Sequence, residues 1–166
     1  MIPSLLIAAL LAQGDTPEIF AEAGGWSISR QGNACLMTRE FGDAGNSIFA
    51  VSVDPQDRTL PLTLLVGNGD WAPPEGEDEG YLLEFSGTGA AWRDLAVRTF
   101  TTDDAGEKVD GVISIGFADD AVVPMLEDVG GASGLHLSRQ GITVVRLSFA
   151  GSDAAVRSLG ECLIAP

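Results

Sequence analysis

The stretch SISRQGNAC, residues 27–35, holds a turn signal and one of the two cysteines of the chain. Polar and apolar side chains alternate before the turn, and a glycine there supplies the positive φ angle that a tight hairpin needs. The core of the stretch returns late in the chain, where residues 137–141 read LSRQG after ISRQG at residues 28–32. We predict that both SRQG segments are hairpin tips, with Arg and Gln on the solvent side, rather than two halves of a binding site.

Outward from this hairpin, most of the chain consists of short apolar or alternating runs separated by Gly, Pro, Asn and Asp. These runs predict strands at residues 26–30, 34–41, 48–53, 60–66, 81–85, 96–100, 112–117, 135–137 and 142–149. The sequence therefore predicts an α+β fold: a mainly antiparallel β sheet, either a sandwich or an open barrel, with two helices from the C-terminal half packed on it.

The two helices are predicted from apolar stripes with helical spacing. The first runs from Ala121 to Val129, capped by Asp120 and ended by Gly130-Gly131, with a stripe made of Val122, Met125, Leu126 and Val129. The second follows Gly151, with Ser152 as its cap and a buried stripe of Val156, Leu159 and Leu163, beside which Cys162 lies.

The N-terminus indicates export. Residues 4–12 form an uninterrupted run of small and apolar residues, too short to span a bilayer and typical of a signal peptide. Ala12 and Gly14 satisfy the small-x-small rule, so we expect a signal peptide at residues 1–14 with cleavage before Asp15, although no Lys or Arg precedes the run. We expect a single β-rich domain at residues 15–166, without a transmembrane segment, in the periplasm or secreted.

The two cysteines support the same compartment. Cys35 lies near the start of the expected mature chain and Cys162 near its end. In an exported chain such a pair predicts a disulfide. In the chain-entropy model, a disulfide that closes the long loop between Cys35 and Cys162 stabilises the fold by about 5 kcal/mol.

The charge of the chain restricts its partners. Asp and Glu total 24 against 9 Lys and Arg, a formal net charge of −15. Such a surface repels phosphate backbones and anionic headgroups, so nucleic-acid binding and docking on anionic membranes are excluded as leading interpretations. A basic protein or a divalent cation would be attracted, and the acidity also serves solubility.

Two segments concentrate the carboxylates, GNGDWAPPEGEDEG at residues 67–80 and TTDDAGEKVD at residues 101–110. Neither follows the alternating ligand pattern of an EF-hand. We interpret them as solvated loops and predict no metal site and no cofactor. The alternatives are a weak calcium site or a contact surface for a basic partner.

The motifs of common enzymes are missing from the sequence. The single histidine, His136, lies between two leucines on a short predicted strand, and no serine has the GxSxG spacing. The glycines at residues 67–69 and 87–89 lack the following helix of a phosphate-binding loop. We therefore expect no enzymatic activity, and a hydrolase using paired carboxylates is the third-ranked function.

The arrangement of these features resembles a group of uncharacterised exported proteobacterial proteins that are rich in β structure. The shared features are Gly25-Trp26, Cys35, Asn68 to Trp71, Tyr81, Trp92 and a terminal strand and helix containing Gly151-Ser152 and Cys162. The last of these is also distantly similar to the invasion-associated locus B proteins, which are tied to host-cell entry. The chain lacks their extra cysteines, so we do not transfer that role.

A second likeness concerns residues 86–92, SGTGAAW. Small β-rich lysozyme inhibitors of the bacterial envelope present a Ser/Gly-rich loop ending in an aromatic residue, and a Gly-rich hairpin turn is the other interpretation. The leading expectation is an exported protein that binds or supports rather than catalyses. The alternative is a proteinaceous inhibitor of a basic enzyme such as lysozyme, with Trp71, Ser86 and Trp92 as its contacts.

Overall fold

The computed structural model describes residues 17–44, 47–71, 75–104 and 107–166. The predicted signal peptide, residues 1–14, lies outside them. In chain order the elements are β1 (Glu18–Ala23), β2 (Trp26–Gln31), β3 (Ala34–Phe41), η1 (Gly42–Ala44), β4 (Ser47–Val53), β5 (Leu62–Asn68), β6 (Gly76–Ser86), β7 (Ala91–Asp104), β8 (Glu107–Phe117), α2 (Asp119–Gly131), β9 (Gly134–Arg139), β10 (Ile142–Ser148) and α3 (Ser152–Ile164). Within these ranges no helix is long and apolar enough to cross a membrane.

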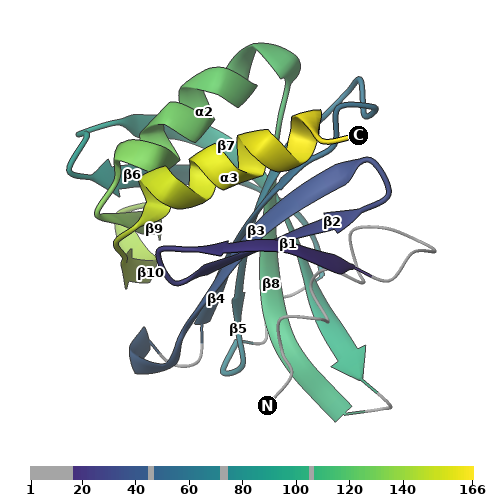
Figure 1. Ribbon diagram of the computed structural model, residues 1–166. Coiled ribbons are helices and arrows are strands. Elements are labelled where there is room, and N and C mark those ends of the chain that lie inside the picture. The colour runs from purple at the N-terminus through teal and green to yellow at the C-terminus, as the bar shows by residue number, and fades with distance from the viewer. Residues whose placement is uncertain (1–16, 45–46, 72–74, 105–106) are drawn as a thin grey trace.

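The ten strands of the described residues form one sheet in the order β1-β2-β3-β4-β5-β8-β7-β6-β9-β10, and every neighbouring pair is antiparallel. The sheet curves strongly but does not close into a barrel, so β1 and β10 are its two edges. The helices α2 and α3 lie side by side on the same side of the sheet (Figure 1). The predicted α+β class is confirmed.

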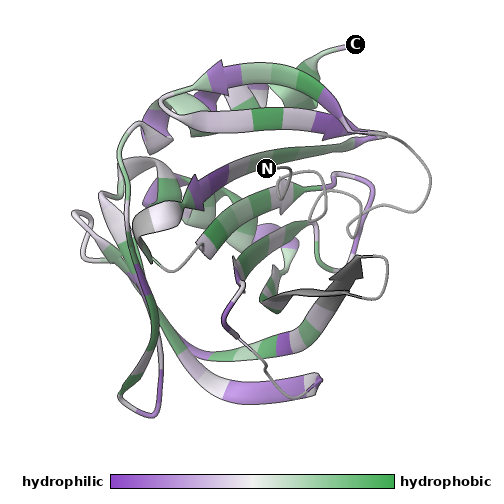
Figure 2. Cartoon of the chain, turned by 90° about the horizontal axis from the view of Figure 1, so that it is seen from below, coloured by the Kyte–Doolittle hydropathy of each residue, from purple (hydrophilic) through white to green (hydrophobic). Residues whose placement is uncertain are grey.

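The core lies on the inner, concave face of the sheet and against the two helices. Alternate residues of each strand point into it, for example Met37 on β3, Phe49 on β4 and Leu64 on β5. Hydrophobic and hydrophilic bands accordingly alternate along several strands (Figure 2). The central strands are buried on their other face too, where Leu36, Ile48, Ala50, Leu65 and Val112 form a second cluster.

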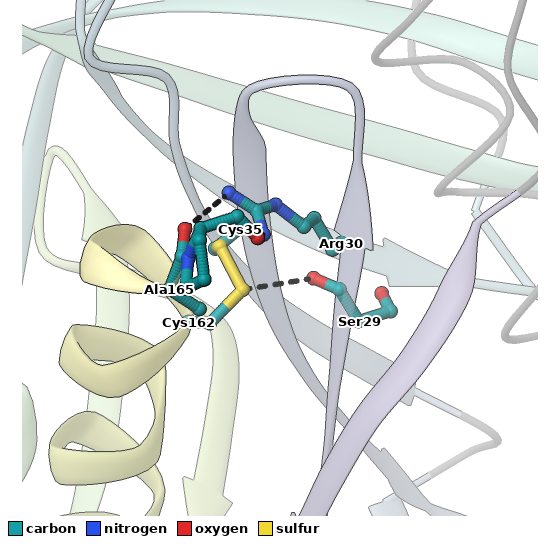
Figure 3. Close-up of a disulfide and its surroundings, with 6 residues drawn as sticks. Ser29, Arg30, Cys35, Cys162 and Ala165 are labelled. Atoms are coloured by element: carbon teal, nitrogen blue, oxygen red, sulfur yellow. Dashed lines mark hydrogen bonds between the residues drawn. A yellow bond between two sulfur atoms is a disulfide. The ribbon is translucent and has the colours of Figure 1, made fainter.

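Helix α3 is fastened to the first strands of the sheet at both of its ends. Near its C-terminal end Cys162 forms the predicted disulfide with Cys35 of β3, with the two Cα atoms 6.1 Å apart (Figure 3). At its N-terminal end Gly151 lies against Gly24 of the β1–β2 turn so closely that a Cβ on Gly151 would lie 2.6 Å from the Gly24 Cα. Trp26 completes this end, because its indole Nε1 donates to Ala150 O at 3.2 Å. The disulfide prediction is confirmed.

Both predicted helices exist, but their caps differ from the predictions. Ala118, not Asp120, precedes α2, and Asp119 and Asp120 lie in its first turn, where the helix dipole favours negative charge. The helix also continues through Gly130 and Gly131 rather than stopping before them. Gly130 lies against α3, because its ideal Cβ position is 3.6 Å from Val156.

Helix α3 is capped by Gly151, which has φ 73°, so the assignment of Ser152 as the cap is wrong. The Ser152 hydroxyl instead donates towards Ala132 O at 3.1 Å and joins the start of α3 to the end of α2. The buried residues of α3 are Ser152, Ala155, Leu159 and Cys162. Val156 and Leu163 of the predicted stripe are only partly buried against the core.

The strands are more extensive than the sequence pattern indicates. The prediction missed β1 entirely, and β6, β7 and β8 are each much longer than predicted. Residues 76–80 of the expected acidic loop form the first part of β6. Residues 101–104 of the acidic turn form the end of β7, and residues 107–110 form the start of β8. Neighbouring strands explain this extension, because they supply the backbone hydrogen bonds that polar segments cannot obtain alone.

Candidate functional site

A cavity of about 800 Å³ lies where the concave face of the sheet opens between β6, β8 and β10. Its volume is within the range of small-molecule and side-chain binding sites. The inner part is formed by Tyr81, Thr99, Ile113 and Val144, and Trp71 stands at its side. Four carboxylates surround the opening, from Asp70, Glu75, Glu77 and Asp78.

The first half of β6 positions the acidic side chains. The pairing of β6 with β7 shifts register between Asp78 and Tyr81, so the strand bulges there. Gly80 has φ 80°, a backbone conformation that residues with a side chain rarely adopt. The absence of a side chain at Gly80 therefore makes the bulge possible. The bulge leaves Glu77 exposed at the rim and Tyr81 buried in the inner part.

Asn68, at the end of β5, organises the other side of the opening. Its buried side chain donates to Ser47 Oγ at 2.8 Å, and its Oδ1 accepts from the backbone N–H of Asp70 at 2.8 Å. The Asn68 backbone carbonyl accepts from Trp71 N at 3.2 Å. These bonds hold Trp71 half-buried beside the cavity, so its position is set by the end of a strand rather than by a free loop.

Arg139 is the one basic residue among the described residues that line the cavity. Its Nη2 donates to Asp78 Oδ1 at 2.6 Å, and its guanidinium carbon lies 5.7 Å from the centre of the Tyr81 ring. The Tyr81 hydroxyl in turn donates to Asp78 Oδ2 at 3.3 Å. The site thus holds its own guanidinium between a carboxylate and an aromatic face, the two kinds of group that bind cations.

The surroundings of Tyr81 keep its phenol neutral. Burial raises the pKa of Tyr81, the Asp78 carboxylate raises it further, and the positive charge of Arg139 partly offsets both. At neutral pH the phenol is therefore a hydrogen-bond donor. It adds no negative charge to the four carboxylates around the opening.

The sequence prediction found part of this site. The sequence indicates Trp71 and the acidic segment as contact candidates, but it assigns no role at a site to Tyr81, Arg139 or Asn68. The prediction that Arg and Gln of the SRQG segments lie on the solvent side is wrong for Gln31, which is buried, whereas Arg139 is 41% exposed and pairs with Asp78. The missed signal is alternation, since Arg139 has the same parity as the inward-facing Leu135 and Leu137.

Ser86 and Trp92, the other two predicted contact residues, lie away from Trp71. Ser86 ends β6, whereas the cavity surrounds the beginning of the same strand, so the structure does not bring the three residues into one patch. Trp92 is partly buried on β7, and its Nε1 donates to Asp128 Oδ2 of α2 at 2.8 Å. Its ring meets Phe117 edge-on at 5.5 Å between centres. The hydrogen bond joins α2 to β7, and the ring contact joins β7 to β8.

His136 lies on β9 between two polar neighbours. Its Nδ1 is 3.2 Å from Glu84 Oε2, and its Nε2 is 2.9 Å from Thr143 Oγ1. The order carboxylate, imidazole, hydroxyl is also that of hydrolase triads. Thr143, however, is exposed on the edge strand β10 and does not line the small cavity that Glu84 and His136 border. We interpret the row as a bridge across β6, β9 and β10.

In the described part of the chain, no three His, Cys, Asp or Glu side chains are grouped so that they could hold a metal ion. Comparisons with protein-family models, curated proteins and solved structures give no significant match. The resemblance to exported proteobacterial proteins and to the invasion-associated locus B proteins therefore stays a prediction.

Proposed function

We propose that this chain is an exported, non-catalytic binding protein and that the cavity beside Arg139 binds a cationic group of a basic polypeptide. The observation that carries the proposal is the pairing of an aromatic and apolar interior with four carboxylates at the opening, of which only Asp78 is paired with Arg139. A ligand side chain would bury its apolar stem against Tyr81 and Val144 and keep its charged end near the carboxylates.

Electrostatics supports the same ligand class. The whole chain carries a formal charge of −15, so a basic polypeptide is attracted at long range before it contacts the cavity. The disulfide Cys35–Cys162 supports the proposed location outside the cytoplasm, because such bonds persist in oxidising compartments.

Inhibition of a basic enzyme such as lysozyme is the more specific form of this proposal. Because Trp71 and Trp92 lie apart, inhibition should be tested on Trp71 rather than on Trp92. Trp92 holds α2, whereas Trp71 borders the cavity. Loss of inhibition on Trp71→Ala, with Trp92 intact, is the expected outcome for an inhibitor that uses the cavity.

The binding proposal is tested by measuring the affinity of a labelled arginine-containing peptide by fluorescence anisotropy at about 0.15 M salt. We expect the double variant Asp70→Asn/Glu77→Gln to bind roughly tenfold more weakly, since each exposed charge pair is worth up to about 1 kcal/mol. The control is Glu127→Gln/Glu161→Gln, which removes two exposed carboxylates from the helices. Equal weakening in both variants would mean that the peptide responds only to net charge.

A further inference from the structure

The edge strand β10 borders the cavity. It pairs with β9 on one side, and among the described strands none pairs with its other side. Val144 of β10 lines the cavity, as does Arg139 across the hairpin. The register of β10 shifts between Thr143 and Val145, so Val144 is the extra residue of a bulge that turns it towards the cavity.

The two edges of the sheet differ in how they are protected. Glu18 and Glu22 lie on β1 together with the exposed Ile19 and Phe20, and helix α3 packs against that strand. Strand β10 carries one basic residue, Arg146, and no carboxylate: residues 129–152 contain no Asp or Glu, and Ile142 at its beginning is 72% exposed. Charged side chains and covering elements are the usual means by which an edge strand avoids pairing with another chain.

We propose that an extended basic polypeptide adds to β10 as an eleventh strand and places one basic side chain in the cavity. This inference rests on the function proposed above and adds the mode of binding. Hydrogen bonds between the two backbones would supply affinity, and the cavity would select the side chain at one inward-facing position. Because β10 has seven residues, a peptide of similar length, about 20 Å when extended, covers it.

The charges favour a polypeptide over a second copy of this chain as the occupant. Two copies, each at −15, repel one another, whereas a basic segment is attracted to the carboxylates that line the cavity. The only charged residue of β10 is Arg146. It is opposite His136 in the register of β9 and β10, on the face away from the inward-pointing Val145 and Leu147. We therefore expect the bound segment to carry its basic side chain at an inward position and a neutral or acidic one opposite Arg146.

The experiment compares three probes with the intact protein: N-acetylarginine amide, a seven-residue peptide with one central arginine, and the same peptide with alternate backbone nitrogens methylated. We expect the plain peptide to bind at least tenfold more tightly than either other probe. In hydrogen exchange the plain peptide should protect amides of residues 142–148 and leave those of residues 18–23 unchanged.

The possible failures are distinct. If the arginine amide binds at the cavity but the peptide gains no affinity and β10 gains no protection, strand addition is wrong and the proposed function stands. If none of the probes binds, both proposals are wrong. If β10 becomes protected with rising protein concentration alone, its edge pairs with a second copy, and the polypeptide proposal is overturned.

Discussion

The two SRQG hairpins have the same tetrapeptide and different turns. In the first, Gln31 pairs with Ala34, so the loop is Gly32-Asn33, with Gly32 at φ 59° as in a type II′ turn. In the second, Arg139 pairs with Ile142, so the loop is Gln140-Gly141. There both loop residues have positive φ, 51° and 78°, as in a type I′ turn. The tetrapeptide specifies a hairpin but not which two residues form its tip.

The arginines of the two hairpins also make contacts in different parts of the molecule. Inward-facing side chains occur at every second position of each strand, and each arginine occupies the last of these positions. Arg30 donates to Ala165 O at 2.9 Å and Pro166 O at 3.1 Å, beside the disulfide (Figure 3). Arg139 pairs with Asp78 at the cavity. The first hairpin thus closes the fold, and the second contributes to the candidate site.

The largest expected difference between the hairpins comes from the disulfide beside the first. Replacing both cysteines, Cys35→Ser with Cys162→Ser, should lower the free energy of unfolding by about 2–5 kcal/mol, because 127 residues separate them. Urea unfolding measures the change, and reduced wild-type protein should match the variant. An unchanged midpoint would mean that the disulfide does not hold the two ends of the chain together.

The two arginines should differ in their effect on stability. Arg30→Gln removes charged hydrogen bonds to two backbone carbonyls and should cost about 1–2 kcal/mol. Arg139→Gln should cost about 0.5 kcal/mol or less, because the Arg139 and Asp78 side chains are 41% and 31% exposed. Parallel urea titrations compare them. A larger loss of stability for Arg139→Gln than for Arg30→Gln would mean that the second hairpin, rather than the first, has the structural role.

The same substitution at the two glutamines should act in opposite directions. Gln140→Asn should stabilise the protein by about 0.5–1 kcal/mol, since Asn-Gly suits the type I′ turn. Gln31→Asn should destabilise it by about 0.5–1 kcal/mol, because Gln31 is buried in a strand, where Asn is unfavourable. Thermal unfolding of both variants measures this. Changes of the same sign would contradict the difference in register.

The smallest expected effect concerns the pKa of Tyr81 beside the second hairpin. Tyr81 is the only tyrosine of the chain, so ultraviolet absorbance of its phenolate reports this residue alone. Its pKa is raised above the ordinary value of about 10, chiefly by burial and then by Asp78, so Asp78→Asn should lower it and Arg139→Gln should raise it further.

The same shift predicts a loss of stability at high pH. The unfolded chain loses the phenolic proton first, so the contribution of Tyr81 is complete below about pH 10 and is lost as pH rises through the folded pKa. Replacing Glu127 by Gln, on the exposed side of α2, is the control and should leave the titration unchanged. Identical titrations for all variants would mean that Tyr81 does not share a site with Asp78 and Arg139.

The sequence by itself determined the features that depend on neighbouring residues. Glycine at a turn and the spacing of apolar residues in the helices act within a few positions, so both hairpin tips and both helices were predicted. The Cys35–Cys162 pair was predictable because the chain has no other cysteine.

Only the tertiary structure decided the register of the hairpins, the strand β1 and the cavity. Arg139 meets Asp78 across 61 residues of chain, and Trp71 reaches the same opening from the end of β5. Such contacts depend on which strands become neighbours and where a strand bulges, as at Gly80 and Val144. Strand order and bulges minimise the free energy of the whole sheet, so a local pattern such as SRQG is compatible with more than one of them.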